Sequence, residues 1–142
     1  MPAFVAVGSA SPGLKVNAVD LSDHVRTLSV KMEAEDVDLT AMGAVSRTHA
    51  PGLRDDEISG TFFQDYASAK VDATLSALVG GAAGCTVIAY ANGVTASATA
   101  PSYTMVGVLL AYDPIDTEIG SASMTPFSFK PAPGSFITRG TA

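Results

Sequence analysis

The residues of this sequence that could act in catalysis are two histidines and one cysteine. A histidine works as a general base when a nucleophile and an orienting acid lie beside it. His24 and His49 stand among polar residues near strand ends or loops, and we interpret both as exposed imidazoles. Cys85 opens an apolar strand and has no neighbouring cation in the sequence that would lower the pKa of its thiol. We therefore expect Cys85 to be buried and unreactive.

Acidic side chains form the sharpest local charge feature, a group made up of Glu33, Glu35, Asp36 and Asp38. As a calcium loop this group fails, because Ala41 stands where the turning glycine belongs and the distal bidentate glutamate is missing. As a pair of glycosidase carboxylates it cannot be judged, because the separation of carboxylates in space decides that chemistry. We interpret the group as a solvated strand face. The alternative is an acidic surface that repels a negatively charged partner.

A second acidic group, Asp55, Asp56 and Glu57, begins the next predicted strand. It can approach Arg47 and Arg54 of the loop before it. Exposed ion pairs of this kind contribute about 0–1 kcal/mol.

The sequence contains no G-x-S-x-G, Walker A, G-x-G-x-x-G, H-E-x-x-H or C-x-x-C pattern. Gly80, Gly81 and Gly84 follow a predicted helix instead of a strand, so they indicate the end of a helix and not a phosphate cradle. We predict that the protein is not an enzyme and uses no cofactor and no metal ion.

The chain has 142 residues, a net charge of -6, 47% hydrophobic residues and 15% charged residues. This length supports one domain over 1–142, with a core that needs no disulfide. The negative charge argues against a protein that grips nucleic acid, because such binding neutralises phosphates with Lys and Arg. Ordinary domains have about 25% charged residues. The shortfall suggests a surface covered by copies of the chain or by partners.

No signal peptide and no membrane-spanning helix are expected. The N-terminus lacks a basic region. The longest apolar stretch, 75–91, is shorter than the roughly 20 residues of a spanning helix and is interrupted by glycines. We therefore predict no membrane insertion.

Alternating residues predict a half-buried strand over 25–34 and another over 57–64. Beyond the first strand the alternation shifts by one residue, so that Val37 and Leu39 fall on its polar face. We therefore expect a bulge near 35–36 that returns these two residues to the core. Between the strands lies a loop over 43–54, which is longer than the usual two to five residues and so is expected to have a function.

One helix is predicted over 68–79. Ser68 can cap it, Asp72 lies in its first turn, and Gly80 ends it. The spacing of one apolar face selects the packing residues Val71, Leu75, Leu78 and Val79.

Further strands are expected over 85–90, 103–112 and 118–129. The middle one is apolar on both faces and is predicted to be covered on both sides. The terminal regions are interpreted as an N-terminal segment over 1–18 and an extended C-terminal arm over 130–142. The predicted fold is mainly β.

Five segments in a fixed order carry a family resemblance: VDLSDHV (19–25), DLTAMG (38–43), PGLRD (51–55), FFQD (62–65) and VDATL (71–75). In this order they resemble the tail tube (major tail) proteins of long-tailed, non-contractile bacteriophages. The similarity is good over 19–80 and looser up to residue 129. None of the segments is a catalytic signature.

The resemblance implies a β-sandwich or barrel-like subunit with one flanking α-helix and a long hairpin. It implies a structural virion protein that forms stacked hexameric rings, and so a hollow tube through which DNA passes during ejection. Strands 25–39 and 57–65 then line the tube, the loop 43–54 contacts the next ring, and the helix 68–79 lies outside. The implied partners are further copies and the tape measure, tail terminator and distal tail proteins, with DNA passing without specific binding. The implied location is the virion tail, after assembly in the host cytoplasm.

On this basis the polar face of the first strand is assigned to the lumen, with Thr27, Ser29, Lys31, Glu33 and Glu35. Lys31 departs from a negative wall and is expected to pair with Glu33 or Glu35. The inter-ring loop is assigned Arg47, His49, Pro51, Gly52 and Arg54, and we expect it to dock on an acidic or polar surface. The alternatives are another self-assembling β protein, such as a secretion-system tube or a capsid decoration protein, and a small monomeric binding module.

Overall fold

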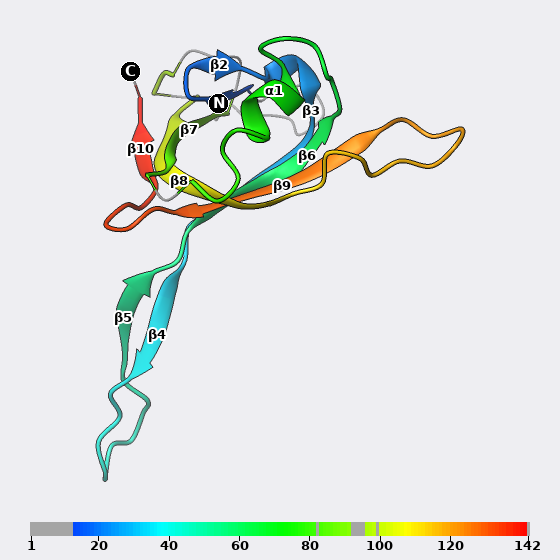
Figure 1. Ribbon diagram of the computed structural model, residues 1–142. Coiled ribbons are helices and arrows are strands. Elements are labelled where there is room, and N and C mark those ends of the chain that lie inside the picture. The colour runs from blue at the N-terminus through cyan, green and yellow to red at the C-terminus, as the bar shows by residue number, and fades with distance from the viewer. Residues whose placement is uncertain (1–12, 82, 92–95, 99, 142) are drawn as a thin grey trace, which may run out of the picture.

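The computed structural model describes residues 13–81, 83–91, 96–98 and 100–141, and its regular elements are almost all strands (Figure 1). The strands are β1 (Gly13–Val16), β2 (Val19–Asp20), β3 (Val25–Lys31), β4 (Ala34–Asp38), β5 (His49–Arg54), β6 (Glu57–Phe63), β7 (Cys85–Tyr90), β8 (Ser102–Tyr112), β9 (Met124–Pro131) and β10 (Thr138–Gly140). The helical elements are the short 3-10 helix η1 (Ser22–His24) and the helix α1 (Val71–Leu75).

One large antiparallel sheet forms the body, in the order β2-β1-β7-β8-β9-β6-β3, and β10 pairs with β8. Leu14 and Val16 of β1 share one core cluster with Ile58 and Phe62 of β6, which lies near the opposite edge of the sheet. The sheet therefore curls around its core, and α1 lies over the open side (Figure 1). This confirms the prediction of a mainly β, barrel-like fold with one flanking helix and a long hairpin.

The core is built from alternate residues of neighbouring strands. Phe127 of β9 stacks on Phe62 of β6, with ring centroids 4.3 Å apart, and meets Phe129 at 5.8 Å. Met105 and Leu109 of β8 are buried in the same cluster. Period-2 alternation thus fixes which face of each strand is apolar.

The strand predictions for 57–64, 85–90 and 103–112 are confirmed to within one residue by β6, β7 and β8. The prediction for 118–129 is wrong at its start, because β9 begins only at Met124. Residues 113–123 instead form a loop that projects from the body (Figure 1). Gly120, at a φ of 88°, and a hydrogen bond from the Ser121 N–H to the Glu118 carbonyl form a turn in it.

The helix is much shorter than the predicted 68–79. Ala69 has a φ of 59°, which excludes helix at that position, so α1 starts at Val71 and Ser68 does not cap it. The turn before α1 is instead built on Asp65, which accepts hydrogen bonds from the Ala67 and Asp72 backbone N–H groups. Of the predicted packing face, the buried residues are Val71 and Leu75, the partly buried one is Leu78 and the exposed one is Val79.

The first predicted strand leaves the body after Lys31. Its continuation β4 pairs with β5 in a separate two-stranded sheet that points away from the body (Figure 1). We call residues 33–55 the arm. The bulge predicted near 35–36 is confirmed by a register shift between Ala34 and Asp36. The expected return of Val37 and Leu39 to the core is wrong, because the arm lies outside the body and Leu39 is exposed.

The predicted loop 43–54 is wrong in its second half, since β5 occupies His49–Arg54. Pro51 and Gly52 are tolerated there because β5 pairs on one side only. The loop at the end of the arm covers 39–48.

The C-terminal region is a packed element and not the extended arm predicted over 130–142. Lys130 and Pro131 belong to β9, Ala132 and Ile137 are buried, and β10 pairs with β8 of the same chain. Of the N-terminal segment 1–18, residues 1–12 lie outside the described residues.

Candidate assembly surfaces

The arm has no hydrophobic core. Its two strands are joined by backbone pairing, by an exposed ion pair of Arg47 with Asp38 at 3.1 Å and by a hydrogen bond between His49 and Asp36 at 2.8 Å. An exposed ion pair contributes about 0–1 kcal/mol. An isolated two-stranded hairpin is marginally stable in water. The arm therefore gains little stability from its own side-chain contacts.

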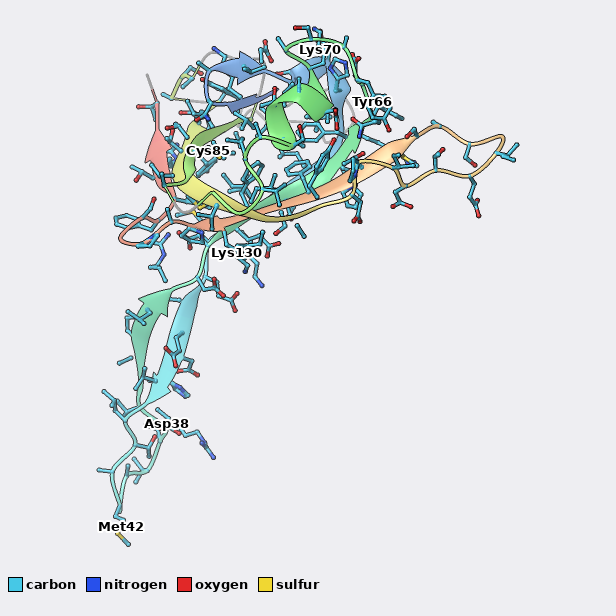
Figure 2. All side chains as sticks on the ribbon, viewed as in Figure 1. Asp38, Met42, Tyr66, Lys70, Cys85 and Lys130 are labelled. Atoms are coloured by element: carbon cyan, nitrogen blue, oxygen red, sulfur yellow. The ribbon has the colours of Figure 1, made fainter. Side chains whose placement is uncertain are left out.

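Fully exposed apolar side chains lie at the end of the arm. Met42 marks its tip in Figure 2, and Val45 in the same loop is equally exposed. The predicted inter-ring residues are distributed along the arm: Arg47 and His49 toward the tip, Pro51 and Gly52 in mid-strand, and Arg54 at the base. Met42 and Val45 were not among the residues predicted for the inter-ring contact, because the prediction rested on the charged and turn residues of the loop.

The base of the arm is organised by Asp56, a fully buried carboxylate. It accepts hydrogen bonds from the Arg54 side chain at 2.7 and 3.1 Å, from the Glu33 N–H at 3.0 Å and from the Ile137 N–H at 2.8 Å. Burial by itself raises the pKa of Asp56, but the hydrogen bonds from Ile137, Arg54 and Glu33 outweigh it, so the pKa is lowered. One carboxylate thus joins both ends of the arm to the C-terminal segment.

Other side chains complete this base, which we call the arm root (residues 31, 33, 35, 53–57, 130–132 and 134–136). The Arg54 guanidinium lies 5.2 Å from the centre of the Phe136 ring, in cation–π range. Lys130 lies 3.5 Å from Asp55 and 3.4 Å from Glu57. Leu53 and Phe136 line a groove of about 610 Å³ together with Lys130 and Ala132. A second groove, on which Leu53 also borders, is lined by Glu33 and Glu35.

The outer face of the main sheet is rich in hydroxyl groups. Ser29, Ser59 and Ser128 are paired in register across three strands. Thr27 and Thr61 form the next row, and Lys31 lies opposite Glu57. Thr27, Ser29 and Lys31 of the predicted lumen set are thus exposed on one open sheet face. Of the other two predicted lumen residues, Glu33 follows the end of β3 and its side chain reaches Lys31 at this face, whereas Glu35 belongs to β4 in the arm.

Ion pairs neutralise much of the charge at this face. Lys31 binds Glu33 at 2.9 Å, which confirms the pairing expected from the sequence, and this hydrogen bond raises the pKa of Lys31. Ser128 donates a hydrogen bond of 2.8 Å to Glu57, which lowers the pKa of that carboxyl group together with Lys130. The open face is therefore polar, with its charges paired, and not strongly negative.

The outer side of β8 forms an apolar strip. Val106 and Leu110 are exposed there, while Met105 and Leu109 on the inner side are buried. The prediction that this strand is covered on both sides is therefore wrong for the single chain. An apolar strip of this kind is a candidate contact for another chain.

The loop between β8 and β9 is held firmly at its base. Gln64 donates hydrogen bonds to the Tyr112 hydroxyl at 2.9 Å and to the Pro114 carbonyl at 2.7 Å. Tyr112 donates in turn to Asp72 of α1 at 3.0 Å, and burial together with this carboxylate raises the pKa of Tyr112 to about 12. Ile115 and Ile119 are exposed further along the loop. These exposed isoleucines were not predicted, because a strand was expected over 118–129 where the structure has a loop up to Ser123.

The two histidines have acidic partners but no nucleophile. His24 lies 2.8 Å from Asp65 and its side chain is only 17% exposed, so the expected exposed imidazole is wrong for this residue. His49 is exposed, as expected. In the part of the chain that the structure describes, no serine, threonine or cysteine is hydrogen-bonded to either ring. Cys85 is buried, as predicted, and burial raises the pKa of its thiol.

Among the residues that the structure describes, no three His, Cys, Asp or Glu side chains gather closely enough to hold a metal ion. No helix in those ranges has the length and apolar character needed to cross a bilayer.

A small curled β body thus carries a coreless two-stranded arm, an open polar sheet face and an exposed apolar strip. These features define a class of β proteins whose surfaces are suited to contacts with other chains. No family model matches the sequence, and no curated protein matches it.

Solved structures do share the fold. A chain in the virion of a native gene transfer agent particle matches with a TM-score of 0.69 and 13% identity, over 90% of this chain and 95% of that one. A chain in the tail of an empty gene transfer agent particle with C6 symmetry matches with a TM-score of 0.64 and 14% identity, over 81% and 82%. A chain in the baseplate of the anti-feeding prophage, 6-fold symmetrised, matches with a TM-score of 0.54 and 13% identity, over 97% and 96%. The likeness establishes a common fold.

Proposed function

We propose that the protein is a structural, non-enzymatic virion protein that forms stacked hexameric rings, and that the rings build a hollow tail tube. The observation that carries this proposal is the arm, a two-stranded hairpin with no core that projects from the body and ends in exposed apolar side chains. Such a hairpin is suited to lie against another copy. The fold shared with chains of sixfold tail and baseplate particles supports the same proposal.

Ring formation is supported by the edges of the main sheet. In the described part of the chain the sheet ends at β3 on one side and at β2 on the other. The outer edge of the seven-residue strand β3 has no partner among the described residues, and an open edge of this kind favours aggregation. Ring closure removes the open edge by pairing it with a neighbouring subunit. The apolar strip on β8 is a second surface that a neighbouring subunit covers.

The tube is proposed to carry DNA during ejection. The open sheet face lines its channel with Thr27, Ser29 and Lys31 of the original lumen set and with the serines of β6 and β9. A channel wall of hydroxyls and paired charges offers DNA no net counterion release, so the DNA is not held. Further partners are the other tail proteins, namely the tape measure, tail terminator and distal tail proteins. The assembled protein belongs to the virion tail.

Electron microscopy of the purified protein tests the assembly. We expect stacked rings, and we expect a variant in which residues 36–51 are replaced by Asn-Gly to give rings or monomers without stacks. The variant keeps Arg54, Asp56 and Ile137, so its body should retain the β-sheet circular dichroism of the native chain. A tube of normal length from this variant would contradict the role of the arm. A native chain that stays monomeric in sedimentation, or that binds only preformed capsids, would contradict the tube.

The channel is tested by adding positive charge to the open face. We expect Ser59→Lys to leave tube assembly unchanged and to slow DNA ejection from the particle that carries this tube, because each ring then presents new cations to the phosphates. Ser76→Lys, at an exposed position next to α1, is the matched control. Equal ejection rates for the two variants would show that the open face does not line the channel.

A further inference from the structure

We propose that the tip of the arm seats on the arm root of a second copy of this chain. This inference rests on the proposed function and deepens it, because it names both halves of the contact that stacks the rings. The tip consists of residues 39–47. The root is the double groove around Leu53 at the base of the arm.

The tip offers apolar groups and one cation. Met42 and Val45 are fully exposed, and Leu39 is also exposed beside them. Arg47 is the only charged residue in 39–47, and its side chain is 77% exposed. Its pair with Asp38 is solvent-exposed and weak, so the guanidinium is free to take a further acidic partner.

The root offers the complementary groups. Leu53 is 81% exposed, and it lines the larger groove with Phe136 and Ala132, which provides an apolar surface for the tip. Glu33 and Glu35 line the smaller groove on which Leu53 also borders.

The charges of the two surfaces are opposite. The root contains five carboxylates and three cations, an excess of two negative charges, whereas the tip carries one positive charge. Of the root carboxylates, Glu35 makes no ion pair among the described residues. The apolar tip therefore matches the larger groove, and Arg47 matches the acidic groove beside it. This also gives the predicted acidic docking surface a definite location.

A tip cannot reach the root of its own chain. The two lie at opposite ends of the arm (Figure 2), separated by roughly 25 Å at about 3.3 Å per residue. Tip-to-root contact is therefore heterologous: each copy offers one tip and one root. Contacts of this type can continue from copy to copy when the rotation between copies does not close into a ring, which is the geometry needed to extend a stack.

Cross-linking between introduced cysteines tests the contact. In assembled protein, Met42→Cys combined with Leu53→Cys should give a ladder of covalent multimers with a bismaleimide linker much shorter than the arm. Cys85 is buried, so the native chain should give no product. The matched control combines Met42→Cys with Ile119→Cys, an equally exposed apolar residue on the β8–β9 loop, and should give no ladder. Either cysteine alone gives at most dimers.

A second measurement removes the apolar groups of the tip. Met42→Ser with Val45→Ser should raise the protein concentration needed for stacking by at least about tenfold, since two buried side chains are lost from the contact. Circular dichroism should be unchanged, because both side chains are exposed in the single chain. Tubes that form without a tip-to-root ladder, or with an equal ladder in the control pair, would overturn this inference and leave the proposed function standing. Absence of tubes from the native chain would overturn the proposed function itself.

Discussion

Replacing Asp56 by alanine is expected to lower the free energy of unfolding by about 2–3 kcal/mol, because a buried donor left without its acceptor costs about 1–3 kcal/mol, whereas the Arg54 side chain is 37% exposed and can turn to water. The substitution leaves the Ile137 and Glu33 N–H groups without their acceptor and the Arg54 guanidinium without its carboxylate. Urea denaturation measures the loss. The base of the arm should also open, so the Arg54 and Glu33 amides should exchange hydrogen faster than in the native chain.

Asp55→Ala is the matched control, because this neighbouring carboxylate is exposed and lies 3.5 Å from Lys130. It should cost no more than about 1 kcal/mol. Equal losses from the two variants would show that Asp56 does not hold the arm root together.

The decrease in the free energy of unfolding at low pH should also depend on Asp56. The pKa of Asp56 in the folded chain lies below the ordinary value of 3.8, so its stabilising effect is complete above about pH 4 and is lost as the pH falls through the folded-state pKa. The difference in stability between the native chain and Asp56→Asn should therefore be largest near neutral pH and shrink in acid. A difference that grows in acid would contradict the lowered pKa.

Replacing Gly60 by alanine is expected to separate β3 from β6. An added Cβ would overlap the carbonyl oxygen of Thr27 and lie 2.9 Å from its carbonyl carbon. Both are backbone atoms in the neighbouring strand, so no side chain can move aside to make room. We expect a loss of about 3 kcal/mol, the upper end of the usual range for overpacking, measured by thermal or urea unfolding.

Hydrogen exchange should locate this damage. The amides of β3 should lose protection in Gly60→Ala, while those of β7 keep theirs because they pair with β1 and β8. Ser59→Ala is the control, since Ser59 points to the open face, and should change stability little. Unchanged protection in β3 would contradict the close approach at Gly60.

The strands of the body could be predicted because their pattern is local. In β6 and β7 buried residues alternate with less buried ones, β8 is a long run of mostly apolar residues, and turn residues mark the ends of these strands. The shortened helix could not be predicted in the same way. Its apolar spacing is correct for a longer helix, but Ala69 takes a left-handed conformation and the turn on Asp65 fixes where α1 begins.

The arm was visible in the sequence only in part. The alternation over 25–34 and the bulge near 35–36 are both present, but a strand that leaves the sheet has the same alternation as one that stays in it. The point of departure after Lys31 depends on contacts with residues far along the chain. For this reason Val37 and Leu39 were expected in the core and lie outside it.

The burial of Asp56 could not be predicted from local patterns either. Its position in an acidic group predicted a solvated carboxylate near Arg54, and the proximity to Arg54 is correct. Its complete burial depends on Ile137, which is 81 residues away in the sequence. The exposed Ile115 and Ile119 of the β8–β9 loop were missed for a simpler reason. Ile119 fell within the strand that was predicted over 118–129.

The hydrogen bond between Asp56 and Ile137 also orders events during synthesis of the chain. The ribosome makes both strands of the arm long before it makes Ile137. A growing chain can therefore pair β4 with β5 early, but it cannot fix the direction of the arm until the C-terminal segment has emerged and folded onto β8. The direction of the arm is therefore a property of the finished chain, set by a contact with one of the last segments to be made.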